Sequence, residues 1–218
     1  MDSRFANPGD KGPLLYYGGT GGTHTLDADF VVVDVETSGL KPAEGARVIE
    51  IAAVRINQAG QEVDSMSTLI NPGDGNTGAD WIHGIKANMV ADAPKFDEIF
   101  NDLARVMDGA IFVAHHAKFD EGFVASEAKH CGIELTQMPG LCTYWLSRRT
   151  VTTTANHKLG TLAQHFGITQ VGAHSALDDA RVVAKMMPLM LASHEPLTYF
   201  SQPVSQKLIL ASAELLPR

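Results

Sequence analysis

The chain has 218 residues, and 17 Lys and Arg against 25 Asp and Glu give it a formal net charge of −8 at pH 7. Hydrophobic residues make up 44% and charged residues 19% of the sequence, which excludes a disordered or fibrous chain. The acidic balance argues against a protein that coats nucleic acid through a broad basic surface, because such binding depends on neutralising phosphates.

The first strand signal is the β-branched run at 30–36, which Thr37-Ser38-Gly39 closes as a turn. Two further strands are expected at 48–56 and 61–70, joined by a short hairpin connection at 58–60. Three consecutive strands with short links predict an antiparallel meander.

The second half of the chain predicts alternating helices and strands. A one-sided apolar pattern predicts a helix over 94–107. Further strands are expected at 110–114 and near Leu141, and further helices at 118–130 (with Gly132 as its C-terminal cap), 159–166 and 176–192.

The ends of the chain have weaker patterns. Residues 1–28 are rich in Gly and Pro without strand or helix periodicity, so we expect a flexible N-terminal extension, followed by a globular domain over 29–195 and a tail over 196–218. No secretion signal is expected at the N-terminus, and no apolar run approaches the ~18 residues of a membrane helix. Cys131 and Cys142 lack a CxxC spacing and are expected to be reduced, which favours a cytoplasmic protein.

Two carboxylates stand at the end of the first strand. Asp34 and Glu36 are alternate residues, so both side chains project from one face of an otherwise apolar strand. Burying two like charges is costly without a cation, and a metal ion is the natural compensation. Taken alone, the pair favours a strand end in water over a metal site.

A third carboxylate, Asp120, follows the strand at 110–114 and the histidines His115 and His116. It falls in the first turn of the next expected helix, where a carboxylate suits the helix dipole. In isolation, Asp120 is compatible with a helix stabiliser or with a metal ligand.

The last helix contains two adjacent aspartates with different surroundings. Asp178 shares its helix face with the basic residue Arg181 and is expected at the surface. Asp179 shares its face with Val182 and Val183, so it is expected to point toward the core, where a carboxylate needs a partner.

Four inward carboxylates, Asp34, Glu36, Asp120 and Asp179, would carry a charge of −4, which two Mg²⁺ or Mn²⁺ ions balance. This is the charge pattern of two-metal phosphodiester hydrolysis. His174 lies just before the last helix and is a candidate to take the proton from an attacking water, because imidazole titrates near neutrality.

Three motifs, D-V-E-T-S-G at 34–39, H-H-A-K-F-D at 115–120 and H-S-A-L-D-D at 174–179, resemble the exonuclease motifs of the DEDDh (DnaQ-like) 3′–5′ exonucleases. This family includes the proofreading epsilon subunit of bacterial DNA polymerase III and RNase T. The resemblance covers about residues 29–192 and implies an α/β, ribonuclease H-like fold with a five-stranded mixed sheet flanked by helices. It also implies that the four carboxylates bind metal ions and that His174 is the general base.

The resemblance further implies contacts with the 3′-terminal nucleotides. The residues in these positions are Thr37, Ser38, Gly39, Leu40, His83, His115, His116 and Phe119. Among them Leu40 is expected to stack against a base, and His83 belongs to an H-G-I segment typical of epsilon-like members. His116 stands where the family usually has Asn, which leaves that contact open. Candidates for phosphate contacts are Lys118, Arg148, Arg149 and Lys158.

The sequence therefore favours a metal-dependent 3′–5′ exonuclease that releases nucleoside 5′-monophosphates from single-stranded or frayed DNA. DNA is preferred because the H-G-I segment and the length are closer to the epsilon subunit than to RNase T. Trimming of RNA 3′ ends and a non-catalytic, polymerase-associated binding subunit are the alternatives. A DNA polymerase is a candidate partner, and residues 206–210 faintly resemble a sliding-clamp-binding peptide.

Overall fold

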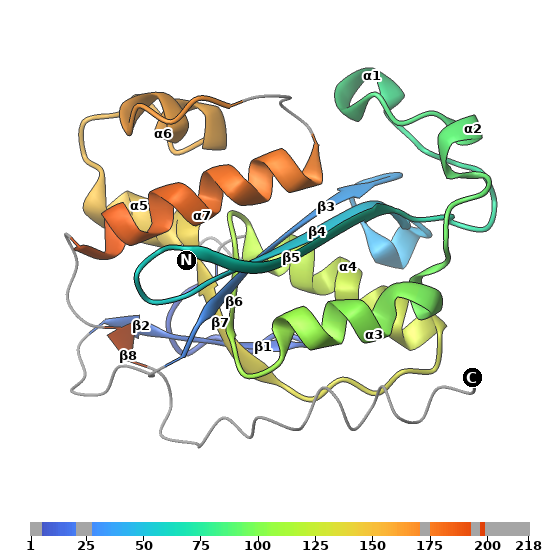
Figure 1. Ribbon diagram of the computed structural model, residues 1–218, viewed down its shortest axis with the longest axis horizontal. Helices are drawn as coiled ribbons and strands as arrows, with labels where there is room; N and C mark the ends of the chain where they lie inside the picture. The colour runs from blue at the N-terminus through green and yellow to red at the C-terminus, as the bar shows by residue number, and fades with distance from the viewer. Residues whose placement is uncertain (1–5, 21–27, 171–174, 193–196, 199–218) are drawn as a thin grey trace.

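The computed structural model of the chain describes residues 6–20, 28–170, 175–192 and 197–198. Its centre is a six-stranded mixed sheet with the strand order β1-β7-β6-β3-β4-β5 (Figure 1). The six strands are β1 (Leu15–Tyr17), β3 (Phe30–Thr37), β4 (Val48–Ile56), β5 (Glu62–Leu69), β6 (Ile111–Ala114) and β7 (Met138–Cys142). A separate antiparallel pair joins β2 (Gly19–Thr20) to β8 (Leu197–Thr198).

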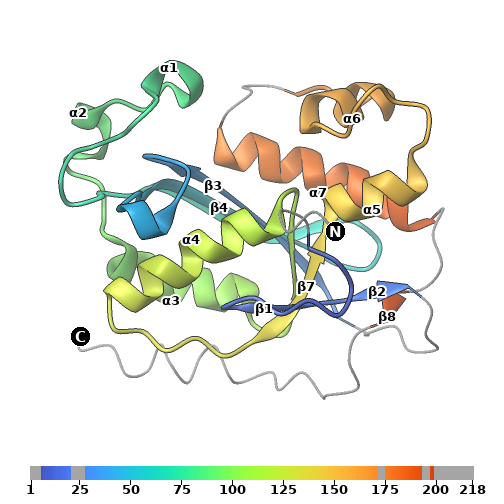
Figure 2. The same ribbon diagram turned by 180° about the vertical axis from the view of Figure 1, so that it is seen from behind.

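Helices cover both faces of the sheet, which gives three layers (Figures 1 and 2). The helix α7 packs on β3 and β4 on one side, and α3 and α4 lie on the other side. The helices are η1 (Pro42–Glu44), α1 (Asp80–His83), α2 (Ala87–Val90), α3 (Phe96–Met107), α4 (Ala117–His130), α5 (Thr143–Thr150), α6 (Leu159–His165) and α7 (Ala176–Ala192). Within the described part of the chain, none of them is both long and apolar enough to cross a membrane.

The predicted meander is confirmed. Strand β3 pairs antiparallel with β4, and β4 pairs antiparallel with β5. After the α3 crossover, β6 adds to the other side of β3 in parallel, and β7 adds in parallel to β6. Because β3 has a neighbour on both sides and a helical layer on both faces, its valines are buried, as a continuous β-branched run predicts.

The sheet has six strands where five were expected, and the extra strand comes from the N-terminal segment. Strand β1 pairs in parallel with β7, and Leu14, Leu15 and Tyr17 are buried. The expectation of a flexible extension is therefore wrong for these residues, because burial of three large side chains holds them on the sheet edge. The division into extension, domain and tail stays a prediction.

Two buried glutamates of α4 bind it to the segments on either side. Glu121 accepts hydrogen bonds from the Tyr17 hydroxyl at 2.5 Å and from the amides of Leu14 and Leu15 at 3.2 and 2.9 Å. Glu127 forms a two-pronged ion pair with Arg47, with N–O distances of 2.8 and 2.7 Å. Partners on both sides fix the position of the helix that carries Asp120.

The expected ends of α4 are close to those observed. Gly132 lies in the left-handed region at φ 70°, directly after the last turn, and the amide of Ile133 donates to the carbonyl of Ala128 at 2.8 Å. This is the usual glycine-based helix ending and confirms Gly132 as the terminating residue. Cys131 and Cys142 are both free thiols.

Candidate active site

Three carboxylates from two segments far apart in the sequence meet at one end of the sheet. Ligand oxygens of Asp34, Glu36 and Asp179 all lie within 4.8 Å of one another. Asp34 and Glu36 come from the C-terminal end of β3, on the face that α7 covers, and Asp179 comes from the first turn of α7. The prediction that these three side chains converge is confirmed.

The fourth predicted carboxylate, Asp120, reaches the same region from α4. Strand β6 runs parallel to β3, so the carboxyl ends of both strands point to the same edge of the sheet, and α4 begins soon after β6. Asp120 is only 4% exposed. Its charge raises the pKa values of Asp34 and Glu36, which places it within electrostatic reach of the cluster.

The carboxylates disfavour ionisation in one another. Burial, followed by the charges of Asp120, Asp179 and Glu36, raises the pKa of Asp34 well above its ordinary value. Burial and the neighbouring carboxylates raise the pKa of Glu36 to about 8, and burial raises that of Asp120 to about 7. Without a counter-charge this cluster retains protons at neutral pH, whereas a divalent cation would stabilise the ionised oxygens.

Two polar residues that the sequence reasoning missed contact this cluster. Glu50 on β4 lies directly opposite Glu36 in the strand register, and its carboxylate accepts a hydrogen bond from the amide of Ala176 at 3.1 Å. The side-chain amide of Gln170 donates to Asp179 at 2.7 Å. A charged residue inside the apolar run V-I-E-I-A-A-V was the available signal for Glu50, but Gln170 had none.

His174, the predicted general base, lies outside the described residues. The chain is described again from Ser175, whose carbonyl accepts the amide of Asp179 at 3.0 Å. His174 is thus two residues before the start of α7, and its role stays a prediction.

The loop after β3 is held by its own polar side chains. The Thr37 hydroxyl donates to the carbonyl of Gly39 at 2.7 Å, and the Ser38 hydroxyl accepts the amide of Arg47 at 2.9 Å. Leu40, beyond them, is 81% exposed. A large apolar side chain in water next to an acidic cluster is available to a ligand, and its predicted contact with a base is not tested.

A second exposed apolar side chain belongs to the neighbouring segment. Gly78, at φ 69°, packs so closely on the Ser38 backbone that a side chain there would clash. Three residues later, in α1, Trp81 is 81% exposed. The close contact between Gly78 and Ser38 brings α1 near the loop that follows the β3 carboxylates.

The other predicted substrate contacts differ in their surroundings. Both ring nitrogens of His83 have partners in its own segment, the carbonyl of Thr77 and the amide of Ile85, each at 3.1 Å. His115 is buried, with its ring nitrogens 3.1 Å from the Thr143 hydroxyl and 2.8 Å from the carbonyl of His157. These bonds show internal packing roles for both rings, and their contacts with substrate stay predictions.

The remaining two predicted contacts lie at the start of α4. His116 is exposed and lies against Tyr144, with ring centroids 4.5 Å apart, so its ring is accessible. Phe119 is half-buried against Phe123, with centroids 4.8 Å apart. Both residues lie within one turn of Asp120.

The predicted phosphate-binding cations lie in different surroundings. Lys118 forms an ion pair with Asp10 at 2.8 Å, and the guanidinium of Arg149 lies 4.1 Å from the centre of the Trp145 ring. Arg148 is in the last turn of α5, and Lys158 directly precedes α6. Contact of these four side chains with phosphates stays a prediction.

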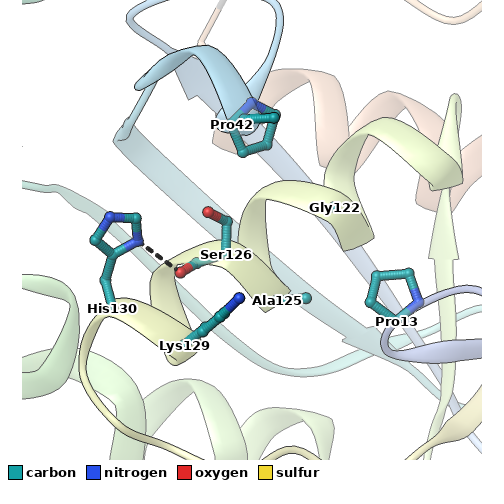
Figure 3. Close-up of a pocket in the computed structure, with 8 residues that line it drawn as sticks. Pro13, Pro42, Gly122, Ala125, Ser126, Lys129 and His130 are labelled. Carbon is teal, nitrogen blue, oxygen red and sulfur yellow. Dashed lines mark hydrogen bonds between the residues drawn. The ribbon is translucent and has the colours of Figure 1, made fainter.

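An open pocket of about 600 Å³ lies on the outer surface of α4, and none of the clustered carboxylates lines it (Figure 3). Its lining is mostly small and apolar, with Lys129 and His130 at one side, and the His130 ring nitrogen Nδ1 is 2.9 Å from the Ser126 carbonyl. The candidate active site is therefore the carboxylate cluster.

Comparison with known proteins agrees with this geometry. A family model described as "Exonuclease" matches residues 31–187. The epsilon subunit of DNA polymerase III from Treponema pallidum is 36% identical over 168 residues, which cover 76% of this chain and 77% of that protein. A PolC-type DNA polymerase III from Caldanaerobacter subterraneus is also 36% identical over 168 residues, which cover 77% of this chain but 12% of the polymerase. The chain thus spans about an eighth of its PolC-type relatives.

A solved structure shares the fold. It is described as the nuclease domain of 3′hExo, a DEDDh family member, bound to rAMP, and it superposes with a TM-score of 0.66 over 81% of this chain and 99% of its own, at 16% identity. With the family match, the relatives and the converging carboxylates together, the chain belongs to the DEDDh 3′–5′ exonuclease family.

Proposed function

We propose that the chain is a metal-dependent 3′–5′ exonuclease that hydrolyses the terminal phosphodiester bond of single-stranded or frayed DNA and releases nucleoside 5′-monophosphates. The observation that carries this proposal is the meeting of Asp34, Glu36 and Asp179 within 4.8 Å, with the buried Asp120 acting on them electrostatically. A cluster of this kind costs folding free energy, so its presence in an otherwise well-packed fold favours a functional role.

The residues fit two divalent ions. All four side chains offer carboxylate oxygens, which Mg²⁺ and Mn²⁺ prefer, and four negative charges match two such ions. When bound, these ions supply Lewis-acid stabilisation of the phosphate and lower the pKa of an attacking water. Asp34, Glu36, Asp120 and Asp179 would hold them.

The chain's own groups complete the reaction. The imidazole of His174 takes the proton from the attacking water oxygen, since an imidazole is half-protonated near neutral pH. The loop formed by Thr37, Ser38 and Gly39 orients the 3′ end, with Leu40 against a base. Because the chain has a net charge of −8 and few candidate phosphate contacts, we expect binding to depend on a short 3′ end and only weakly on salt concentration.

DNA is the substrate we favour, because the two polymerase relatives are named as DNA polymerases. The same pocket acting on RNA 3′ ends is the second candidate, which the rAMP complex of 3′hExo favours. A polymerase or sliding clamp is the proposed partner by analogy with the epsilon relative, and such a role implies the cytoplasm. The clamp-like segment at 206–210 lies outside the described residues. Retention of every motif carboxylate argues against a purely non-catalytic binding subunit.

One assay separates these candidates. End-labelled single-stranded DNA, duplex DNA with a mispaired 3′ terminus and RNA are each incubated with Mg²⁺, Mn²⁺ or a chelator, and product sizes are followed in time. We expect stepwise shortening from the 3′ end with metal only, fastest on DNA. Internal cutting, or equal rates with chelator, would refute the proposal, and faster shortening of RNA would select the second candidate.

The matched pair Asp179→Asn and Asp178→Asn controls for general damage. The two residues are neighbours in α7, but only Asp179 belongs to the carboxylate cluster. We expect Asp179→Asn to abolish shortening and Asp178→Asn to retain it. Equal activity in the two variants would contradict the assignment.

A further inference from the structure

The feature that the proposed chemistry leaves unexplained is a fifth carboxylate, Glu50. It is half-buried on β4, directly opposite Glu36 in the antiparallel register, and the register shifts just beyond this pair. Opposed residues in such a ladder have Cβ atoms about 4.5–5.5 Å apart, and like charges there are destabilising. An acidic residue at this position therefore needs a compensating interaction.

That interaction is a hydrogen bond to the start of α7. The Glu50 carboxylate accepts the amide of Ala176 at 3.1 Å, across 126 residues of sequence. Ala176 is the first residue of α7, and the amides of a first helical turn have no acceptor within the helix.

The contact fixes the part of α7 that carries catalytic groups. Asp179 lies three residues after Ala176, and its carboxylate accepts the side-chain amide of Gln170 at 2.7 Å. Glu50 from the sheet and Gln170 from the preceding segment thus hold the first turn of α7 from two directions.

We propose that Glu50 is a positioning residue, which holds the N-terminus of α7 so that Asp179 meets the carboxylates of β3. This inference rests on the proposed exonuclease function for its catalytic consequence. It assigns Glu50 a role as a hydrogen-bond acceptor and not as a further metal ligand.

The test compares two substitutions of Glu50. Glu50→Gln keeps an oxygen that accepts the Ala176 amide, whereas Glu50→Ala removes it. We expect Glu50→Gln to keep kcat within about threefold of the unaltered protein, and Glu50→Ala to lower kcat by about 10–100-fold, the usual cost of losing support behind a metal site. KM for a single-stranded oligonucleotide should change little in either, because Glu50 does not contact substrate.

A matched control is available on the next strand. Glu62 of β5 also contacts α7, through a two-pronged pair with Arg181 at 3.1 and 3.2 Å, but it is exposed and lies away from the cluster. Glu62→Ala removes a carboxylate contact to the same helix. We expect it to keep the unaltered kcat.

Hydrogen exchange gives a readout that does not need activity. Glu50→Ala should speed exchange of the amides in the first turn of α7 by about tenfold, and Glu50→Gln and Glu62→Ala should not. If no polymer is cleaved by the unaltered protein, the proposed function fails while the exchange result still decides whether Glu50 holds the helix.

Three outcomes would overturn the inference. One is a Glu50→Gln variant as inactive as Asp179→Asn, which would give Glu50 a role through its charge. The others are unaltered kcat in Glu50→Ala and unaltered exchange in the first turn of α7. If Glu50→Ala does not fold, the activity of Glu50→Gln still decides between support and refutation.

Discussion

Replacing Asp34 with Asn is expected to stabilise the metal-free protein while abolishing its activity. Four other carboxylates, Glu36, Glu50, Asp120 and Asp179, raise the pKa of Asp34 through their charges. Asn has nearly the same shape as Asp but no charge. The substitution therefore removes the centre of the mutual repulsion and leaves the packing of β3 intact.

The expected gain in stability can be calculated from the distance between the clustered oxygens. Two unit charges 4.8 Å apart repel by about 1 kcal/mol in water and by about 3.5 kcal/mol at an effective dielectric constant of 20. For a half-buried group between these limits we expect a gain of about 1–3 kcal/mol in the free energy of unfolding near pH 8.5. At about 2–4 °C per kcal/mol for a chain of this size, Tm rises by about 2–12 °C.

The gain should depend on pH with a definite sign. The folded pKa values of Glu36, about 8, and Asp120, about 7, lie above their ordinary values of 4.5 and 3.8. Between these limits the folded protein holds protons that the unfolded chain releases, so the stability of the metal-free unaltered protein falls as pH rises. Near pH 5 the neighbouring carboxyls are protonated in the fold, and the advantage of Asp34→Asn should largely disappear.

Thermal unfolding at pH 5, 7 and 8.5, measured either in chelator or with excess Mn²⁺ and no chelator, tests these effects. Mn²⁺ should raise the Tm of the unaltered protein most at pH 8.5 and have little effect on Asp34→Asn, because a bound ion stabilises only the fold that holds it. Asp178→Asn is the control and should show neither effect. A lower Tm for Asp34→Asn at pH 8.5, or a gain independent of pH, would refute the electrostatic reasoning.

Three other predictions concern the rest of the structure. Glu121→Ala leaves the Tyr17 hydroxyl and two backbone amides without their acceptor, so the free energy of unfolding measured in urea should fall by about 2–5 kcal/mol; an unchanged m-value and midpoint would contradict this anchoring role. His174→Ala should lower kcat by about 10²–10⁴-fold with little change in oligonucleotide affinity, and a loss of binding alone would assign His174 another role. In a Trp145→Phe background, single-stranded DNA added in chelator should quench the fluorescence of the exposed Trp81; unaltered emission at saturation would place the strand elsewhere.

The sequence predicted the strands and helices whose side chains follow a clear period. The bounds of β4 were predicted to the residue, and those of β5 and α3 to within two residues, because alternation or a one-sided apolar stripe continues along each element. Strand β1 was missed because three residues in a Gly- and Pro-rich segment are too few to show a period. Helix α5 was missed because its buried side mixes Thr143, Trp145, Leu146 and Ser147 and so lacks an apolar stripe.

The residues of the candidate site also fall into those that a sequence pattern predicts and those that it does not. Asp34, Glu36 and Asp179 were predictable because strand alternation and helix periodicity define the face of each residue. The interaction of Glu50 with Ala176 was not predictable, since it joins a side chain to a backbone amide 126 residues away, and no pattern in the sequence encodes that contact. The internal hydrogen bonds of His83 and His115 were hidden for the same reason.

Two neighbouring residues in the first turn of α4 interact with different parts of the molecule. Asp120 acts electrostatically on the carboxylates of β3, while Glu121 accepts a hydrogen bond from the amide of Leu15, 106 residues upstream. The edge strand β1 therefore helps to fix the position of the helix that carries Asp120. Trimming residues 6–18, or straining them with a domain fused ahead of them, should loosen metal affinity although every coordinating side chain stays in place.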